Sequence, residues 1–233
     1  MGKSWKNPVK AANAAKKGAI ITKLAREIQV ATKMGGPNPE YNARLRAAVD
    51  AAKAQSCPVD TIERAIKKGS GQLEGETIDE ITYEGYGPHG VGIILECQTN
   101  NKNRTASEVR SLFKNNEGNL GESGSVAWMF ERVCLLEATR SGTFDPEEEA
   151  IEAGANEVEK MDEHFAFYGN PENLDSIRKA LTQRGWKVGT AELSYKAKTP
   201  ADITEEQKKA VVEFLNEVDD FEDTHRVHST LVL

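Results

Sequence analysis

Residues 133–196 read VCLLEATRSGTFDPEEEAIEAGANEVEKMDEHFAFYGNPENLDSIRKALTQRGWKVGTAELSYK, and this stretch decides the class of fold. Its apolar residues follow either the two-residue period of strands or the 3.6-residue period of helices. The segments come in the order strand (133–139), helix (145–153), strand (156–160), strand (164–168), helix (173–184) and strand (187–196). This β-α-β-β-α-β order is typical of a ferredoxin-like domain, which we predict here.

The segment before this module has the pattern of an α+β domain that is left unfinished. Strands are predicted over 80–86 and 91–98, where a short turn joins them into a hairpin. A helix is predicted to open at Thr105, where Glu108 completes a capping box. The apolar run 125–130 is predicted to be a buried strand.

A helix over 204–218, capped by Thr204, and a strand over 226–233 end the chain. They are too short to form a domain alone, so we predict that they return to the unfinished domain and make the ferredoxin-like module an insertion. The predicted fold is therefore multi-domain α+β, with three parts. They are a helical domain (1–74), a central α+β domain (75–132 plus 203–233) and an inserted ferredoxin-like domain (133–202).

The N-terminal part has the period of a small helical bundle. The first predicted helix covers 18–34, and the second begins at Asn38-Pro39, with an N-cap and a proline in the first turn. The third opens at Asp60, where Glu63 completes a capping box, and ends at Gly69. We therefore predict three helices packed as a bundle.

The formal net charge of −7 hides an uneven distribution. Residues 1–68 carry 14 Lys and Arg against 5 Asp and Glu, a net charge of +9, whereas the rest of the chain carries −16. A basic end indicates a polyanionic partner, because Lys and Arg displace the counterions condensed on nucleic-acid phosphates. The candidate nucleic-acid contacts are Lys3, Trp5, Lys6, Lys10, Lys16, Lys17, Lys23, Arg26, Lys33 and Arg104.

Within this set, Trp5 is a candidate for stacking on a base, while Lys23, Arg26 and Lys33 share one face of the first predicted helix with Lys16. A solvated helix face is the alternative explanation of such a charge run. No helix-turn-helix, RRM or zinc-finger pattern is recognised, so sequence-specific base reading has no support. Charge alone does not separate DNA from RNA.

Other candidate sites are assigned structural roles. The glycine-rich loop 118–124 lacks a Gly-Lys-Ser/Thr ending and precedes a strand, so we predict a turn rather than a phosphate cradle, with Arg104 beside it as a phosphate contact. His225 and His228 are predicted to lie on opposite faces of a strand, without a shared metal. We predict no metal, no cofactor and no catalysis.

The three cysteines, Cys57, Cys97 and Cys134, are widely spaced and odd in number. They are predicted to be small core residues in a reducing compartment. Neither a signal peptide nor an apolar run of membrane-spanning length is recognised. We therefore expect a cytoplasmic protein without a membrane or small-molecule partner.

Several motifs in fixed order resemble those of one family. They are Gly35-Gly-Pro-Asn-Pro39, Ile62-Glu-Arg-Ala-Ile-Lys-Lys-Gly69, Tyr83-Glu-Gly-Tyr-Gly-Pro88, Asn103-Arg-Thr105 and Gly118-Asn-Leu-Gly-Glu-Ser-Gly-Ser-Val-Ala-Trp-Met-Phe130. On these motifs the chain resembles the YebC/PmpR family, which includes a mitochondrial translational activator of cytochrome c oxidase. The similarity extends over essentially the whole chain.

This resemblance implies a three-domain cytoplasmic protein with a non-enzymatic role in gene expression. Some members are described as DNA-binding transcriptional regulators, and others as ribosome-associated factors that aid translation through proline runs. We expect a nucleic-acid-binding regulator whose basic N-terminal domain contacts phosphates. The alternatives are a translation factor that binds ribosomal RNA on the ribosome, and a protein-interaction module without nucleic-acid contact. The oligomeric state is left open.

Overall fold

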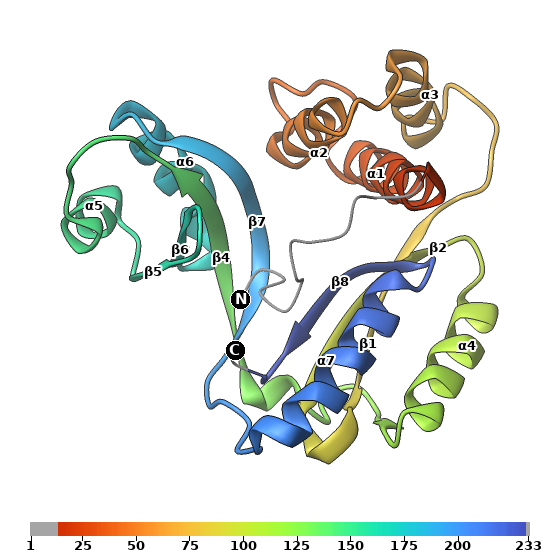
Figure 1. Ribbon diagram of the computed structural model, residues 1–233. Coiled ribbons are helices and arrows are strands. Elements are labelled where there is room, and N and C mark those ends of the chain that lie inside the picture. Colours follow the sequence, from red (N-terminus) through yellow and green to blue (C-terminus); the bar gives the residue numbers. More distant parts are fainter. Residues whose placement is uncertain (1–13, 232–233) are drawn as a thin grey trace. The chain divides into compact units, whose positions relative to one another are not determined.

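The computed structural model describes the backbone of residues 14–231 and their side chains from residue 18 onward. These residues form seven α-helices and eight strands, and the strands lie in two four-stranded sheets (Figure 1). The chain is therefore a mixed α+β protein, as predicted. It divides into two compact units. One comprises Phe130–Ala197, and the other comprises the described residues up to Met129 and from Lys198 onward.

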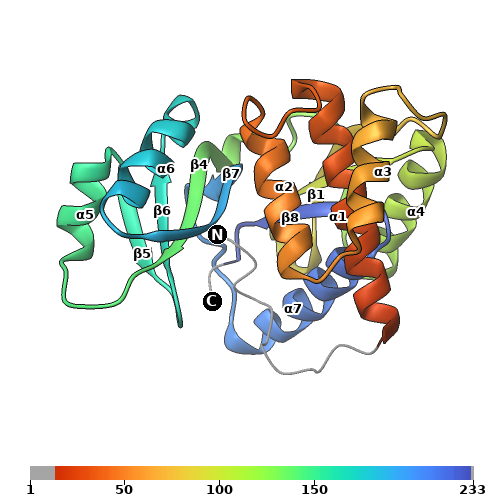
Figure 2. The ribbon, with the colours of Figure 1, turned by 90° about the horizontal axis from the view of Figure 1, so that it is seen from above.

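Three helices open the larger unit. They are α1 (Ala14–Gly35), α2 (Ala43–Ala54) and α3 (Val59–Gly69). α1 lies between α2 and α3 (Figure 2), and their buried faces, which include Ile28 and Leu45, form one apolar core. Gly69 allows α3 to approach α1, because a Cβ at this position would lie 2.4 Å from the carbonyl oxygen of Gln29.

The second helix starts later than predicted. It begins at Ala43 rather than at Asn38-Pro39, and Asn38 caps only a turn, in which its side chain accepts from the backbone N–H of Glu40 at 2.9 Å. Asn42 caps it instead: the side-chain oxygen accepts a hydrogen bond from the backbone N–H of Leu45 at 3.0 Å. The amide of Asn42 donates to the carbonyl oxygen of Ala31 at 2.8 Å, which ties the start of α2 to α1.

The capping boxes predicted at Asp60 and Thr105 are not formed. α3 follows Pro58 without a side-chain cap, and α4 (Lys102–Asn115) begins earlier, with Asn101 as its cap. The Thr105 hydroxyl is buried and donates to a carboxylate from another part of the chain. For α3 and α4 the sequence patterns located the helix but not its cap, because the choice among neighbouring polar side chains depends on what each one is buried against.

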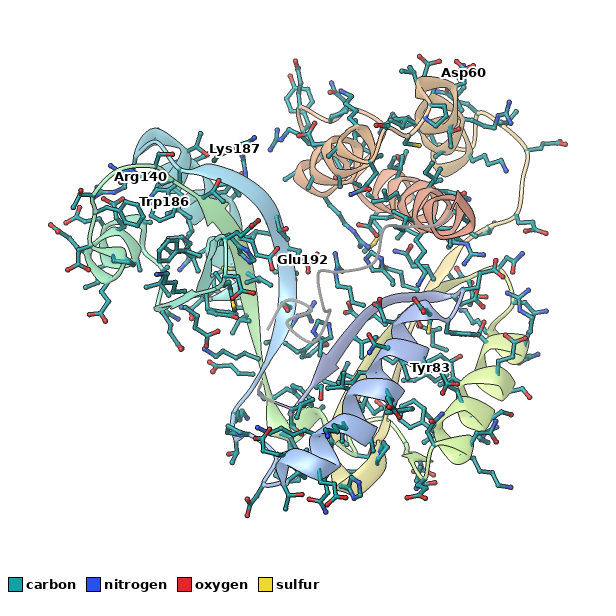
Figure 3. All side chains as sticks on the ribbon, in the orientation of Figure 1. Asp60, Tyr83, Arg140, Trp186, Lys187 and Glu192 are labelled. Carbon is teal, nitrogen blue, oxygen red and sulfur yellow. The ribbon has the colours of Figure 1, made fainter. Side chains whose placement is uncertain are left out.

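The larger unit also contains an antiparallel sheet with strand order β3-β1-β2-β8. Its strands are β1 (Asp79–Tyr86), β2 (Gly92–Thr99), β3 (Asn119–Leu120) and β8 (Thr224–Ser229). α4 and α7 (Glu205–Asp220) share one core with this sheet, in which the rings of Phe113 and Phe214 meet edge to face at 5.1 Å. Tyr83 lies between β1 and α4 (Figure 3). The cap of α7 is Thr204, as predicted.

The strand predicted over 125–130 is wrong for most of its length. Residues Ala127–Met129 form a short 3-10 helix, and strand β4 (Phe130–Thr139) begins only at Phe130. Trp128, expected in a buried strand, has 65% of its surface exposed. The cause lies outside the segment: a carboxylate from β1 binds its backbone N–H groups, which holds the chain in a turn.

The smaller unit has the β-α-β-β-α-β order that the opening stretch predicts. After β4 come α5 (Pro146–Ala153), β5 (Glu157–Lys160), β6 (Phe165–Gly169), α6 (Leu174–Gln183) and β7 (Lys187–Ala197). The antiparallel sheet has the order β5-β6-β4-β7. Trp186 packs edge to face against three phenylalanine rings in the core between sheet and helices.

One acid of this unit has a role that the sequence does not reveal. The sequence explains the acids at 147–149 as partners of the α5 dipole. Glu149 is instead buried, and it accepts hydrogen bonds from Arg184 at 2.8 Å and from the Trp186 indole at 3.0 Å. Arg140, beside Trp186 in Figure 3, also pairs with it. The hydrogen bond from Arg184 lowers the pKa of Glu149 to about 2.

Glu149→Gln is expected to destabilise the protein by about 2 kcal/mol at pH 7. Because the folded-state pKa lies below the ordinary value of 4.5, the carboxylate stabilises the fold above pH 4.5 and loses this effect as the pH falls towards 2. Urea unfolding at several pH values measures it. The difference between wild type and variant should shrink over this window, whereas exposed Glu148→Gln should leave the profile unchanged.

Two simpler expectations can be checked on the described residues. Cys57, Cys97 and Cys134 are buried and free, as predicted, and burial raises the pKa of the Cys97 thiol to about 12. Within residues 14–231, none of the helices has the length and apolar character needed to cross a bilayer.

Candidate nucleic-acid interface

Six of the ten predicted contacts cannot be placed by their side chains. Lys3, Trp5, Lys6 and Lys10 lie outside the described residues, and so do the side chains of Lys16 and Lys17. The four that can be placed, Lys23, Arg26, Lys33 and Arg104, all lie in the larger unit. Their assignment as nucleic-acid contacts therefore stays a prediction. The structure adds which side chains surround each of them.

Arg26 of α1 and Arg104 of α4 meet at one carboxylate. Arg26 Nη1 lies 3.0 Å from Asp223 Oδ1, and Arg104 Nη2 lies 3.0 Å from Asp223 Oδ2. The Thr105 hydroxyl also donates to Asp223 Oδ2 at 2.7 Å. The Asp223 side chain is 1% exposed; this burial raises its pKa, but the bonds from Thr105 and Arg104 outweigh it, so the pKa lies below its usual range.

Lys33 and Lys102 form a second pair of the same kind. Their ammonium groups lie 3.2 Å from the two carboxylate oxygens of Asp79, where β1 begins. The hydrogen bonds from Lys102 and Lys33 hold the pKa of Asp79 below its ordinary value. Unlike Asp223, the Asp79 side chain is 42% exposed. Lys102 was missed by sequence reasoning, although it stands two residues before Arg104.

These four side chains form what we call the basic cluster: Arg26, Lys33, Lys102 and Arg104. Arg26 and Lys33 are two turns apart on α1, so they lie on the same side of that helix about 10 Å apart. Lys102 and Arg104 belong to the first turn of α4. The structure thus brings together three of the predicted residues and one unpredicted lysine, from segments far apart in the sequence.

Acidic groups border the basic cluster in this arrangement. Glu222 pairs with Arg26 at 2.7 Å, in addition to the pairs with Asp79 and Asp223. Lys23, the fourth predicted residue, lies one turn before Arg26 on α1 and donates to the backbone carbonyl of Asp219, in the last turn of α7, at 2.6 Å. A cation at a helix C-terminus is favourable in itself.

The glycine-rich loop is not beside Arg104. Arg104 lies in the first turn of α4, whereas the loop 118–124 follows the last turn, so the length of a 14-residue helix, about 20 Å, separates them. The predicted position of Arg104 beside this loop is therefore wrong, while its role as a phosphate contact stays a prediction. Neighbours in sequence were separated because the intervening segment is a straight helix.

The loop is built around its own carboxylate. Glu84 of β1 accepts hydrogen bonds from the backbone N–H groups of Gly124 at 2.8 Å, Val126 at 2.9 Å and Ala127 at 2.9 Å. These are the groups that a phosphate cradle would use for its ligand. Burial raises the pKa of Glu84, but the three N–H donors outweigh this, so its pKa lies below the ordinary value. The geometry favours the predicted structural turn.

A partly buried polar network joins the helices to the central sheet. The guanidinium of Arg44 donates to both carboxylate oxygens of Glu27, at 2.7 and 2.9 Å, and also pairs with Glu80. Gln98 donates to Glu27 at 2.6 Å. His225 Nε2 lies 3.2 Å from Glu27, and burial lowers the pKa of His225 to about 4, so the imidazole is neutral at pH 7.

Three members of this network have the spacing of a metal site. Ligand atoms of Glu27, Glu80 and His225 all lie within 4.8 Å of one another. Arg44 already contacts both carboxylates and supplies the positive charge that they require, so an ion-pair network accounts for the group. His228 contacts a different acid: its Nε2 lies 3.5 Å from Glu96.

Comparison with known proteins places the chain in a family. Residues 3–72 match the TACO1/YebC protein N-terminal domain, and residues 78–231 match the TACO1/YebC second and third domain. A probable transcriptional regulatory protein of Bdellovibrio bacteriovorus is 63% identical over 99% of this chain and 100% of its own length. A protein of the same description from Bacillus licheniformis is 44% identical over 97% of each.

A solved structure agrees with these matches. The crystal structure of a conserved hypothetical protein from Aquifex aeolicus is 40% identical, with a TM-score of 0.88 over 97% of this chain and 95% of that one. The resemblance inferred from the sequence motifs is therefore confirmed, and the chain belongs to the TACO1/YebC family.

Proposed function

We propose that this chain regulates gene expression by binding nucleic acid through phosphate contacts of its basic N-terminal part and of α4. The relatives named above as probable transcriptional regulatory proteins support the regulatory role. The observation that carries the binding proposal is the basic cluster. Two aspartates each bridge a cation of α1 to a cation of α4, in a chain whose net charge is −7.

The proposed contacts are made to the phosphate backbone of the nucleic acid rather than to its bases. Lys and Arg side chains on a convex helical surface can reach a phosphate backbone without reading base edges. The predicted basic residues of the first 17 positions extend this set beyond the described side chains, and Lys23 remains part of the proposal. Binding that depends mainly on phosphates is strongly salt-dependent and tolerant of sequence.

A salt titration tests the proposal. Binding of the full chain to duplex DNA and to structured RNA is measured by fluorescence anisotropy over a range of NaCl concentrations. Neutralising four to six phosphates predicts a slope of log K against log salt of about −4 to −5 for duplex DNA. Lys33→Gln with Lys102→Gln should make this slope less negative by about 2 and weaken binding to all sequences alike.

The control is the loss of one positive charge elsewhere. Lys209→Gln, an exposed lysine of α7, should leave the slope unchanged. If the double variant behaves like Lys209→Gln, the basic cluster is not the interface. If the wild type shows no salt-dependent binding to either nucleic acid, the proposed function is wrong and a protein-interaction role replaces it.

A further inference from the structure

We propose that the acidic residues at the edge of the basic cluster, Asp79 and Glu222, act as built-in competitors of phosphate. In the free protein these acids form ion pairs with the Lys and Arg side chains that would otherwise contact nucleic-acid phosphates. This inference rests on the proposed function and adds a form of autoinhibition to the same site. It predicts that removing an acid which pairs with the cations of the basic cluster strengthens nucleic-acid binding.

The contacts of these two acids have the geometry of phosphate contacts. Asp79 presents one carboxylate oxygen to Lys33 and the other to Lys102, each at 3.2 Å, as a bridging phosphate would. Glu222 Oε1 lies 2.7 Å from Arg26 Nη2. Arg104 also pairs with the exposed Glu108 of the same helix, at 3.9 Å, so each of the four cations in the basic cluster meets an acid that itself lies near the surface.

Exposure separates the competitors from the structural acid. Glu222 is 73% exposed, so exchanging its ion pair for a phosphate costs little packing, and the same holds for Asp79 at the surface end of β1. Asp223 is buried under Arg26, Arg104 and Thr105, so we assign it to positioning the two arginines. The buried Asp223 would hold the two arginines in place while the exposed acids are displaced.

Competition of this kind raises selectivity. A polyanion of low charge density must displace the internal carboxylates to make the same contacts, so it gains little binding free energy. A nucleic acid with dense phosphate charge replaces several carboxylates at once. The cluster then contributes little to indiscriminate binding. This agrees with an otherwise acidic chain of net charge −7.

The test uses exposed residues around Asp79, so that folding is retained. Asp79→Asn in the full chain should bind duplex DNA about three- to tenfold more tightly than wild type at moderate salt, as expected from releasing two exposed ion pairs. Glu222→Gln should show a gain in the same direction. Glu213→Gln, an exposed acid of α7, is the control for the general loss of negative charge.

A double-mutant cycle isolates the competition. In a Lys33→Gln, Lys102→Gln background, Asp79→Asn should give only the small change seen with Glu213→Gln, because the cations that Asp79 screens are gone. The proposal is overturned if Asp79→Asn still raises the DNA affinity in this background. It is also overturned if, in the wild-type background, Asp79→Asn raises the affinity no more than Glu213→Gln does. Circular dichroism and thermal unfolding of every variant confirm that the comparison is between folded proteins.

The outcomes also separate this proposal from the function on which it rests. If the wild type binds in a salt-dependent way but Asp79→Asn binds no more tightly than the Glu213→Gln control, only the proposed competition is overturned. Absence of binding to duplex DNA and to structured RNA in wild type and all folded variants overturns both.

Discussion

Replacing Glu84 by alanine is expected to lower the free energy of unfolding by about 3 kcal/mol, because three backbone N–H groups lose a charged acceptor in a partly buried turn. Urea unfolding at pH 7 measures this loss. The folded-state pKa of Glu84 lies below the ordinary 4.5, so its stabilisation is complete above pH 4.5 and is lost as the pH falls below that value. The variant should therefore be less sensitive to acid than wild type.

Two further variants make this prediction specific. Glu84→Gln keeps the shape and one oxygen acceptor, so its loss should be about half as large. Glu122→Ala removes an exposed acid of the same loop and should change stability by less than about 0.5 kcal/mol. Equal effects of Glu84→Ala and Glu122→Ala would show that the carboxylate does not organise the loop.

Asp223→Ala is expected to destabilise the protein by about 3 to 5 kcal/mol, since it breaks a buried ion pair and leaves two arginines and a hydroxyl without their common acceptor. The loss should appear in thermal and in urea unfolding at pH 7. The folded-state pKa of Asp223 lies below 3.8, so this stabilisation is present above that pH and disappears as the pH falls through the folded-state value.

The adjacent acid provides the contrast. Glu222→Ala removes an exposed partner of the same arginine and should cost less than about 1 kcal/mol. Asp223→Asn retains an acceptor for Thr105 but not the charge, and its loss should lie between the two. If Asp223→Ala is as mild as Glu222→Ala, then Asp223 does not hold α1 and α4 together, and its assignment as the structural acid fails.

Most helices and strands were predictable because their signals are local. A period of 3.6 or 2 residues and a nearby cap or glycine identify an element within its own length. The largest error has a cause outside its own segment. Residues 125–130 are as apolar as a strand, but Glu84, 40 residues earlier, binds the N–H groups that a strand would place in a ladder.

The candidate interface was predictable in composition but not in arrangement. The excess of Lys and Arg over residues 1–68 identified Arg26 and Lys33, and a motif identified Arg104. Nothing near Lys102 indicated that it would share an aspartate with Lys33, since the two lysines are 69 positions apart. Arg104 was placed beside the wrong element because the length of α4 separates neighbours in sequence.

The sequence by itself determined the class of fold, the order of elements, the family motifs and the positive charge of the N-terminal part. The tertiary structure alone decided which acid each cation meets. Arg26 and Asp223 are 197 positions apart, and they meet only because β8 returns to pair with β2 and brings the end of the chain back to α1. Periodicity and capping act over a few residues, whereas the partners of a charge depend on distances in space that the folded chain sets.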